Sequence, residues 1–558
     1  MSTGLRFALA MLLMLVVILV TNMLFPPIAP EPPPAPAGPA EGGQVEVDPE
    51  PAFPEAEPEA GGLLGVDDER RETLVTVETP LYTITFSNRG AAARSIRLTG
   101  HRSFARDGAV ELVPDGARVL AGTWQVGTDQ VDLTRISYEV SPADGIRLGE
   151  GAGPRTLTFR YENPTQPVVS EIRYTFSADS YLVTVEGELP ARERAALFVD
   201  LGVGLAVNEL KEGDDRRSMA FSGNHVDEGI SARPLSRVRE SEIMEGPLRW
   251  AAVKSKYFVE VILPGDGTGQ SGFLSGVWAE PVALRDRAAL RVGMPMGGDG
   301  TYTYRAYLGP IDPEILAGFG DDLQEVNPVG FAFLRPIIRP FVGLIHWTVN
   351  TLHDQFQLGY AWVLIVIGIL VRVLLWPLNQ RAMRSQMKMQ AIQPLAMDLR
   401  KKFADDPQKM QQETMKLYRE HKVNPLGGCL PLLIPWPVLI ALFFVFQNTI
   451  QLRGVPFMWL PDLSAPDPLY ILPIFLGASM FLLQFISMRA MTAANPQMKM
   501  MMYILPIVMV FIFWRLASGL NLYYAAFNVA TIPQQILIAR ERKKAQPGSS
   551  APASGPRR

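Results

Sequence analysis

One basic side chain stands inside an otherwise apolar run, and it is the residue of this sequence best placed to act on a ligand. The run is YAWVLIVIGILVRVLLWPLNQ, residues 360–380, and the base is Arg372. An arginine inside a bilayer costs roughly 2.5–3.5 kcal/mol, so it needs water or a partner. It lies about six residues, or about 9 Å, from the cytoplasmic end of the predicted span near residue 378, close enough to snorkel to the interface. Position alone therefore leaves snorkelling and a hydrated site as equal alternatives.

Neutral polar side chains in the neighbouring apolar stretches are the available partners for Arg372, because none of those stretches has an acid in its interior. Singly, each such side chain is typical of a hydrogen bond between helices. Together with an unpaired arginine they predict a wet groove of positive potential. The polar set is Gln447, Asn448, Gln484, Asn521, Tyr523, Tyr524, Asn528, Thr531, Gln534 and Gln535.

Methionines are the second concentration of one residue type. Methionine often fills irregular gaps in a core, but a flexible Met-rich surface also accepts many unlike apolar segments. The residues alone leave both interpretations open. The methionines are Met383, Met387, Met389, Met397, Met410, Met415, Met498, Met500, Met501 and Met502.

Covalent chemistry has no recognisable machinery in this sequence. There is no H-E-x-x-H, no G-x-S-x-G, no Gly-rich phosphate loop and no Cys/His pair, and the single Cys429 cannot form an intrachain disulfide. We therefore expect no enzymatic activity, no cofactor and no metal site. An ion-coupled transporter is disfavoured too, because such proteins usually carry Asp, Glu or His inside their spans.

The N-terminal segments predict a membrane anchor and a linker. Residues 1–25 end in the apolar run FALAMLLMLVVILVTNMLF, which approaches the roughly 20 residues that cross a bilayer. This length favours an uncleaved signal anchor over a cleaved secretory signal, with its N-terminus in the cytoplasm. Residues 26–65, rich in Pro, Ala and Glu, indicate a disordered linker.

Residues 66–328 predict an all-β domain. Short runs alternate apolar and polar residues and are bounded by Gly, Asn, Asp and Pro, a pattern typical of a sandwich of antiparallel sheets. The segment 192–218 has no clear pattern. The runs are Leu74–Val77, Leu81–Phe86, Thr156–Tyr161, Ile172–Phe176 and Tyr181–Val185.

The C-terminal half predicts a helical membrane domain. Residues 329–356 favour an amphipathic helix in the outer interface. A core over 357–540 then holds five apolar stretches, at about 359–378, 426–449, 468–488, 500–514 and 517–538. Lys and Arg crowd the loop 379–424, itself a predicted helical hairpin, and the tail 541–558, whereas the loop 450–467 has one base, Arg453. The positive-inside rule therefore places both termini in the cytoplasm and the β domain in the periplasm.

Several motifs resemble the YidC/Oxa/Alb family of membrane protein insertases. The resemblance covers nearly the whole chain apart from the Pro-rich linker and the last dozen or so residues. The run Pro435-Trp436-Pro437 and Arg515 depart from the family pattern and put the local helix geometry in doubt. The motifs are Val371-Arg372 with Trp376-Pro377-Leu378, the run VNPLGGCLP at 423–431, Ser518-Gly519-Leu520 with Leu522-Tyr523-Tyr524, and Tyr307–Pro310.

The resemblance implies a polytopic α-helical membrane protein of the inner membrane, with a five-helix insertase core, an N-terminal signal anchor and a large periplasmic β sandwich. Its groove opens to cytoplasm and lipid, and the family's groove arginine and tyrosine fall on Arg372 and Tyr524. The expected substrate groove is Arg372, Tyr524, Asn521, Asn528, Gln447 and Gln484. The expected substrate-capture hairpin carries Met383, Met387, Met410 and Met415.

The resemblance also implies partners. They are nascent membrane proteins, the Sec translocon and its accessory subunits, the ribosome and signal recognition particle pathway, and membrane lipids, without nucleic-acid binding by the chain itself. The alternative function is a scaffold or assembly platform that does not insert its clients and whose groove is incidental.

Overall fold

The structure is a computed structural model that describes residues 71–163, 169–265, 272–284, 286–328, 335–403, 406–421, 436–489 and 496–544. The chain forms two compact units. The β unit contains the described residues up to Arg335 together with Phe444–Arg453. The helical unit contains Pro336–Phe443 and the described residues from Gly454 onward. The predicted anchor at 1–25, the linker at 26–65 and most of the predicted tail lie outside the described residues.

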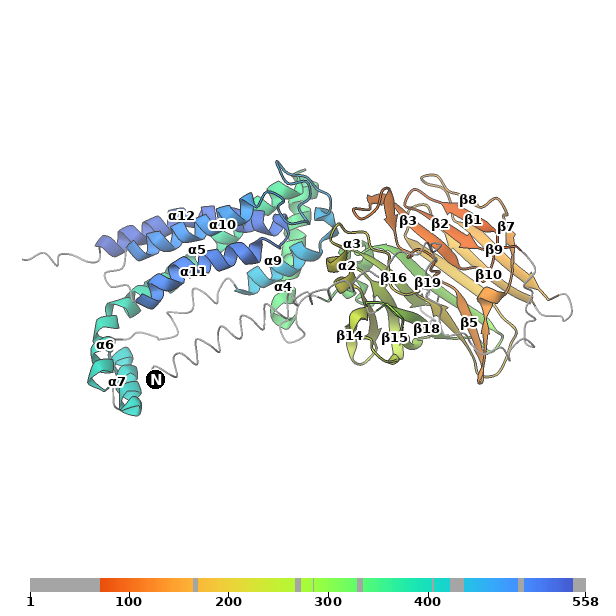
Figure 1. Cartoon of the computed structure of the whole chain (residues 1–558), viewed down its shortest axis with the longest axis horizontal. Coiled ribbons are helices and arrows are strands. Elements are labelled where there is room, and N and C mark those ends of the chain that lie inside the picture. Colours follow the sequence, from red (N-terminus) through yellow and green to blue (C-terminus); the bar gives the residue numbers. More distant parts are fainter. Residues whose placement is uncertain are drawn as a thin grey trace, which may run out of the picture. The chain divides into compact units, whose positions relative to one another are not determined.

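The β unit is built from two sheets (Figure 1). The smaller sheet has the order β4-β3-β2-β1-β8, and β8 pairs with β1 in parallel while the other pairs are antiparallel. Its strands are β1 (Leu74–Glu78), β2 (Tyr82–Ser87), β3 (Ala93–Arg102), β4 (Ala109–Glu111) and β8 (Ile146–Arg147).

Within the described residues the larger sheet has fourteen strands, twelve of them in the order β6-β5-β12-β18-β17-β15-β16-β19-β11-β10-β9-β7. Off this path, β13 pairs with β15, and β14 pairs with β13. The strands are β5 (Gly122–Val126), β6 (Asp129–Asp132), β7 (Glu139–Ser141), β9 (Arg155–Glu162), β10 (Val169–Phe176), β11 (Leu182–Glu188), β12 (Ala195–Asp200), β13 (Ala220–His225), β14 (Gly229–Pro234), β15 (Glu242–Lys254), β16 (Phe258–Pro264), β17 (Leu274–Pro281), β18 (Ala288–Pro295) and β19 (Thr301–Pro310).

Alternation along the strands places the core between the two sheets. In β10 every second side chain is buried, and Tyr174 stands opposite Leu157 on β9 and Val185 on β11. Across the sandwich, the ring of Phe86 on β2 lies 4.7 Å from the ring of Tyr174 and 5.9 Å from that of Phe159. The predicted antiparallel sandwich is confirmed. The segment that had no clear pattern contains β12 and the short helix α2 (Glu212–Ser218), and α3 (Pro313–Ala317) follows the last strand.

The helical unit contains long helices that run alongside one another (Figure 1). Contacts join α5 to α12, α12 to α10 and α10 to α11. The helices are α4 (Arg335–Asn350), α5 (Tyr360–Ala391), α6 (Gln393–Lys402), α7 (Pro407–Glu420), α9 (Trp436–Asn448), α10 (Ile471–Arg489), α11 (Pro496–Phe513) and α12 (Ser518–Lys544). The part of α9 from Phe444 onward belongs to the β unit.

The apolar stretches of the sequence fall on α5, α9, α10, α11 and α12. Within the described residues, Tyr360–Gln380 of α5 is long and apolar enough to cross a membrane, and the apolar parts of α10 and α11, Ile471–Ile486 and Tyr503–Phe513, are shorter. Helix α5 does not stop at residue 378 but continues to Ala391. The first part of the stretch 426–449, with the VNPLGGCLP run, lies outside the described residues.

Helix α4 has apolar side chains on opposite sides. Ile338, Ile345 and Val349 are buried, whereas Leu344 and Trp347 are more than half exposed. An exposed apolar side is what a helix in a membrane interface requires, and the interfacial location stays a prediction.

The connection between α9 and α10 holds the first turns of α10 and α12. The carboxylate of Asp467 accepts from the backbone N–H groups of Leu469 at 3.0 Å and Leu472 at 2.7 Å, which caps α10. At the start of α12, the N–H groups of Ser518 and Gly519 donate to backbone oxygens of the same connection at 2.7 and 2.8 Å. These bonds place the starts of α10 and α12 beside each other.

Candidate functional site

The seam between α5 and α12 positions Arg372. Gly368 permits a close approach of the two helices there, because a Cβ on this residue would lie 2.8 Å from the backbone oxygen of Tyr523. Further along, Arg372 contacts first Phe527 and then Gln534. Because residue numbers rise together along both helices, α5 and α12 run parallel.

Both helices present their seam residues at the same intervals. Steps of four and seven residues keep side chains on one face of an α-helix, since seven residues make about two turns. One face of α5 and one face of α12 therefore meet over three turns. The facing residues are Gly368, Arg372 and Asn379 on α5, and Tyr523, Phe527 and Gln534 on α12.

Arg372 is held by two neutral amides. Its Nη2 donates to Oε1 of Gln534. When the Asn379 amide is turned with its oxygen towards the guanidinium, Oδ1 accepts from Nη1 at 2.8 Å and from Nη2 at 3.0 Å. Nε2 of Gln534 donates to the backbone oxygen of Trp376 at 3.2 Å, and this bond orients the amide so that its oxygen faces Arg372. The guanidinium also lies 5.5 Å from the centre of the Phe527 ring.

The seam leaves the charge of Arg372 without a counter-ion. The residue is 4% exposed, and its contacts within the described part of the chain are with neutral groups. Its Nε has no hydrogen-bond partner among the described residues. A guanidinium offers five N–H donors, so the site has positive potential and donor capacity to spare. Such a site suits an anionic group. Arg372 lies between two helices and does not extend along the surface of α5.

Two predicted groove residues form hydrogen bonds between helices. Nδ2 of Asn528 donates to Oγ of Ser479 at 2.9 Å and joins α12 to α10. Nδ2 of Asn521 donates to the backbone oxygen of Phe513 at 3.0 Å and closes the turn between α11 and α12. Neither contact involves Arg372.

The remaining predicted groove residues lie elsewhere in the bundle. Tyr524 is half-buried, with its ring 5.0 Å from that of Phe513. Gln484 is half-buried on α10. Gln447 belongs to α9, and its side chain lies outside the described residues. Their assignment to a substrate groove stays a prediction.

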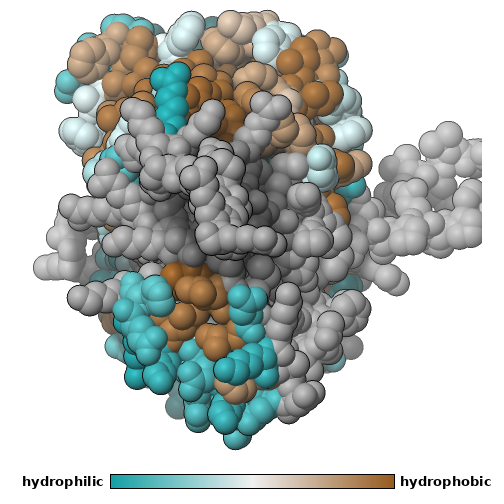
Figure 2. Space-filling view, turned by 90° about the vertical axis from the view of Figure 1, so that its left-hand side faces the viewer, coloured by the Kyte–Doolittle hydropathy of each residue, from teal (hydrophilic) through white to brown (hydrophobic). Residues whose placement is uncertain are grey.

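The predicted capture hairpin comprises α6, α7 and the extension of α5. Met410 is half-buried on α7 and Met415 is 41% exposed there. Met383 and Met387 lie on α5, with side chains outside the described residues. In Figure 2 the hairpin forms the lower part of the view, and its surface is mostly hydrophilic with a hydrophobic strip. A strip of this kind can contact an apolar segment.

The sequence interpretation did not identify Asn379 and Phe527 as neighbours of Arg372. A signal for Asn379 was present, because it follows Arg372 by seven residues, but the predicted span ended one residue before it. Phe527 carried no signal, because an aromatic residue in an apolar helix is ordinary.

Comparisons with known proteins cover most of the chain. The family described as 60Kd inner membrane protein matches residues 351–546, and the YidC periplasmic domain matches residues 74–344. The membrane protein insertase YidC of Chlorobium limicola is 31% identical over 495 residues, which is 84% of this chain and 82% of the relative. That of Syntrophus aciditrophicus is 30% identical over 489 residues, 86% of this chain and 87% of the relative. A solved structure of an active YidC insertase with its first transmembrane domain resolved is 18% identical, covers 85% of this chain and 94% of that chain, and has a TM-score of 0.33.

Proposed function

The chain belongs to the YidC family of inner-membrane proteins, and on this premise we propose that it inserts nascent membrane proteins into the bilayer by way of the polar seam at Arg372. No covalent step, nucleotide or cofactor is part of the proposal. The clients are membrane proteins with a hydrophobic segment and a short hydrophilic flank.

Insertion proceeds in three steps in this proposal. The hydrophobic segment of a client first contacts the α6–α7 hairpin. Its hydrophilic flank then enters beside Arg372, which attracts an acidic side chain and lowers the cost of desolvating it. The segment finally moves along α9 and α11 into lipid, driven by apolar transfer at roughly 25 cal/mol per Å².

The observation that carries the proposal is the set of partners of Arg372. Gln534 and Asn379 satisfy part of its donor capacity without neutralising its charge. The amides accept through partial charges, whereas a carboxylate carries a full negative charge, so Coulomb attraction to the guanidinium favours a client carboxylate over these amides. The counter-ion then comes with the client.

The membrane topology and the partners belong to the proposal as well. Parallel α5 and α12 agree with three membrane spans, α9, α10 and α11, between them, and the basic hairpin favours cytoplasmic termini and a periplasmic β unit. The chain acts alone or with the Sec translocon and its accessory subunits, and receives clients from the ribosome and signal recognition particle pathway.

Arg372→Ala and Arg372→Lys test the charge in a strain depleted of the chromosomal protein. The reporters are two single-span clients that differ only in their translocated flank, which is acidic in one and Asn/Gln-substituted in the other. Arg372→Ala should lower insertion of the acidic reporter about tenfold, because one charge-assisted hydrogen bond contributes about 1.5 kcal/mol or more. Arg372→Lys keeps the charge but not the planar set of N–H donors, so its insertion of the acidic reporter should lie between those of the wild type and Arg372→Ala.

The matched control is Arg515→Ala, which removes an exposed arginine just after α11 and should leave both reporters unchanged. If Arg372→Ala inserts the acidic reporter as well as the wild type does, the electrostatic step is wrong.

A scaffold that does not insert its clients is the second candidate, and the low exposure of Arg372 is the observation in its favour. Photocrosslinkers placed along α9 and α11 distinguish the two functions. An insertase should crosslink to the hydrophobic segment of a stalled client at successive positions of both helices. Crosslinks restricted to the hairpin or the β unit would favour the scaffold.

A further inference from the structure

The short segment Ile450–Arg453, which follows α9, is bound by the β unit. Ile450 joins the hydrophobic core of that unit and is 7% exposed. Gln451 donates from Nε2 to Oδ2 of Asp312 at 3.2 Å. Leu452 is fully buried. Ile450 and Gln451 thus contact the same unit, as neighbouring side chains of a docked peptide do.

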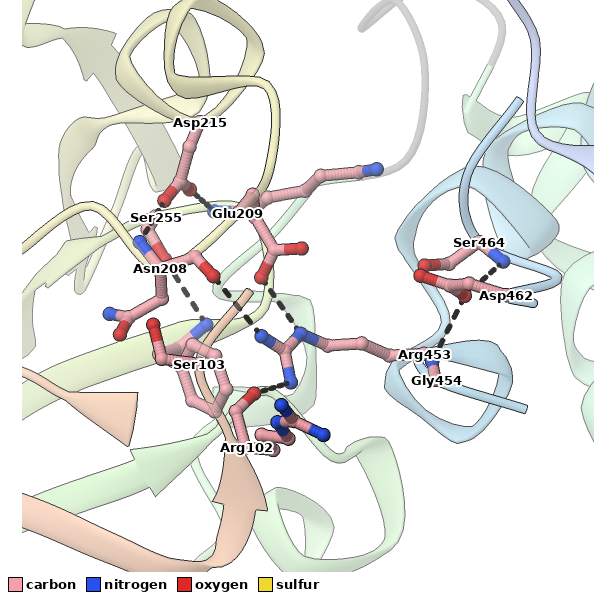
Figure 3. A network of polar contacts seen from close by, with 12 residues as sticks. Arg102, Ser103, Asn208, Glu209, Asp215, Ser255, Arg453, Gly454, Asp462 and Ser464 are labelled. Carbon is pink, nitrogen blue, oxygen red and sulfur yellow. Dashed lines mark hydrogen bonds and ion pairs between the residues drawn. The ribbon is translucent and has the colours of Figure 1, made fainter. Parts of the chain in front are cut away.

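The last residue of the segment, Arg453, fills a polar pocket in which each of its three guanidinium nitrogens donates to a different oxygen (Figure 3). Nε donates to Oε1 of Glu209 at 2.7 Å, Nη1 to the backbone oxygen of Arg102 at 2.7 Å, and Nη2 to the backbone oxygen of Asn208 at 3.4 Å. A lysine ammonium cannot reproduce this planar set of donors.

Aromatic rings complete the pocket. The guanidinium carbon of Arg453 lies 4.3 Å from the centre of the Phe104 ring, 5.3 Å from that of Phe258 and 5.9 Å from that of Tyr257. The side chains of Arg453 and Glu209 are 4% and 13% exposed. A desolvated cation facing aromatic rings and a carboxylate is held far more firmly than a surface ion pair.

The walls of the pocket are held without Arg453. The backbone N–H of Asn208 donates to Oδ2 of the buried Asp215 at 3.0 Å, and its Nδ2 donates to the backbone oxygens of Glu111 at 2.7 Å and Ala206 at 3.0 Å. The carbonyl of Asn208 itself accepts from the backbone N–H groups of Phe104 at 2.8 Å and Ala105 at 3.3 Å, so its position does not depend on Arg453. The pocket is therefore a preformed site and not a chance surface contact.

We propose that this pocket is a guanidinium-binding site of the β unit and that Arg453 is its built-in ligand, which anchors the segment Phe444–Arg453. Arg453 is then a positioning residue that fixes the Asn448 end of α9. The proposal goes beyond the insertase function and does not depend on it.

Hydrogen exchange of the full chain in mild detergent tests the anchor. Arg453→Ala should speed exchange of the amides of residues 444–453 at least tenfold, because the segment loses the side chain that fixes its end. Arg453→Lys should be nearly as fast, and it serves where the Ala variant does not fold. Arg106→Ala is the matched control, since it removes an exposed arginine and its ion pair with Asp115 without touching the pocket, and should change nothing.

Chemical rescue separates a binding site from general support of the fold. Millimolar methylguanidinium added to Arg453→Ala should restore most of the lost protection, whereas methylammonium at the same concentration should not, because it lacks the planar donors. Three results would each overturn the proposal. In the first, the amides of residues 444–453 in Arg453→Ala are protected to within twofold of the wild type. In the others, both cations restore the protection equally, or neither cation restores it.

Discussion

A buried carboxyl group in the β unit makes the stability of that unit depend on pH in a predictable direction. Glu260 lies on the inner strand β16, opposite Val253 on β15 and Leu308 on β19, and is 0% exposed. Among the described residues, neither of its carboxyl oxygens has a hydrogen-bond partner. Burial, with a smaller effect from the charge of Glu111, raises the pKa of Glu260 from 4.5 to about 8.

The sign follows from proton binding. Above pH 4.5 the unfolded carboxyl group has lost its proton, whereas the folded one keeps it up to about pH 8. The folded state therefore binds more protons in this range, and the free energy of unfolding falls as the pH rises. Between pH 7 and pH 8 the expected fall is about 1 kcal/mol, or about a fivefold change in the unfolding equilibrium.

Two other buried groups titrate near this pH interval, and their effects have opposite signs. Burial raises the pKa of Asp200 to about 7, so its effect, in the same direction as that of Glu260, acts mainly at lower pH. Burial lowers the pKa of Lys254, which lies on β15 opposite Val259, to about 8, so the loss of its proton raises the free energy of unfolding as the pH rises and partly offsets the effect of Glu260. Hydrogen exchange of the amides of Val259–Leu263 in the full chain, corrected for the intrinsic pH dependence of exchange, reports the local opening equilibrium.

Glu260→Gln should remove the effect of Glu260, because glutamine does not titrate, and Glu245→Gln, at an exposed position of β15, should keep it. Protection that is equally independent of pH in the wild type and in Glu260→Gln would refute the reasoning. It would mean that water or an unrecognised partner stabilises the charged form of Glu260.

Two further predictions concern the helical unit. Gly368→Ala should destabilise the chain by about 1–3 kcal/mol in thermal unfolding in detergent, because the new methyl group would meet the backbone of α12. The control Gly343→Ala, with nothing within 4 Å of its Cβ position, should be neutral or stabilising. Equal stability of the two variants would contradict the close contact of α5 with α12. Asp467→Ala should lower the free energy of unfolding by about 1 kcal/mol and speed hydrogen exchange of the amides of Leu469 and Leu472, since it removes the cap of α10. Unchanged exchange of these two amides would show that the cap is not needed.

The sequence predicted the β strands well because burial in a sandwich imposes an alternation that can be seen in the residues themselves. Helix α2 gave no such signal. Its buried residue is a carboxylate, Asp215, and hydrogen bonds from the backbone N–H groups of Asn208 and Lys256 hold it in place. A helix that is fixed by polar contacts has no apolar period from which it could be predicted.

The sequence predicted Arg372 and Gln534 of the candidate site but did not identify Asn379 as their neighbour, and the end of α5 shows why. Hydropathy ended the predicted span at residue 378, but the hydrogen bonds that propagate a helix do not depend on hydropathy, and α5 continues to Ala391. Asn379 therefore stays on the face of Arg372. For Arg453 the sequence supported only a count of loop charges, because the partners of its side chain are hundreds of residues away along the chain.

The covalent link between Arg453 and its pocket changes how much affinity the pocket needs. A tethered ligand experiences an effective concentration on the order of millimolar, without any diffusion to the site. A pocket with an intrinsic Kd of about 0.1 mM for a guanidinium group would then be filled about nine-tenths of the time. A modest site is therefore enough to keep the segment docked, and free cations can compete with Arg453 only at concentrations comparable to that of the tethered group.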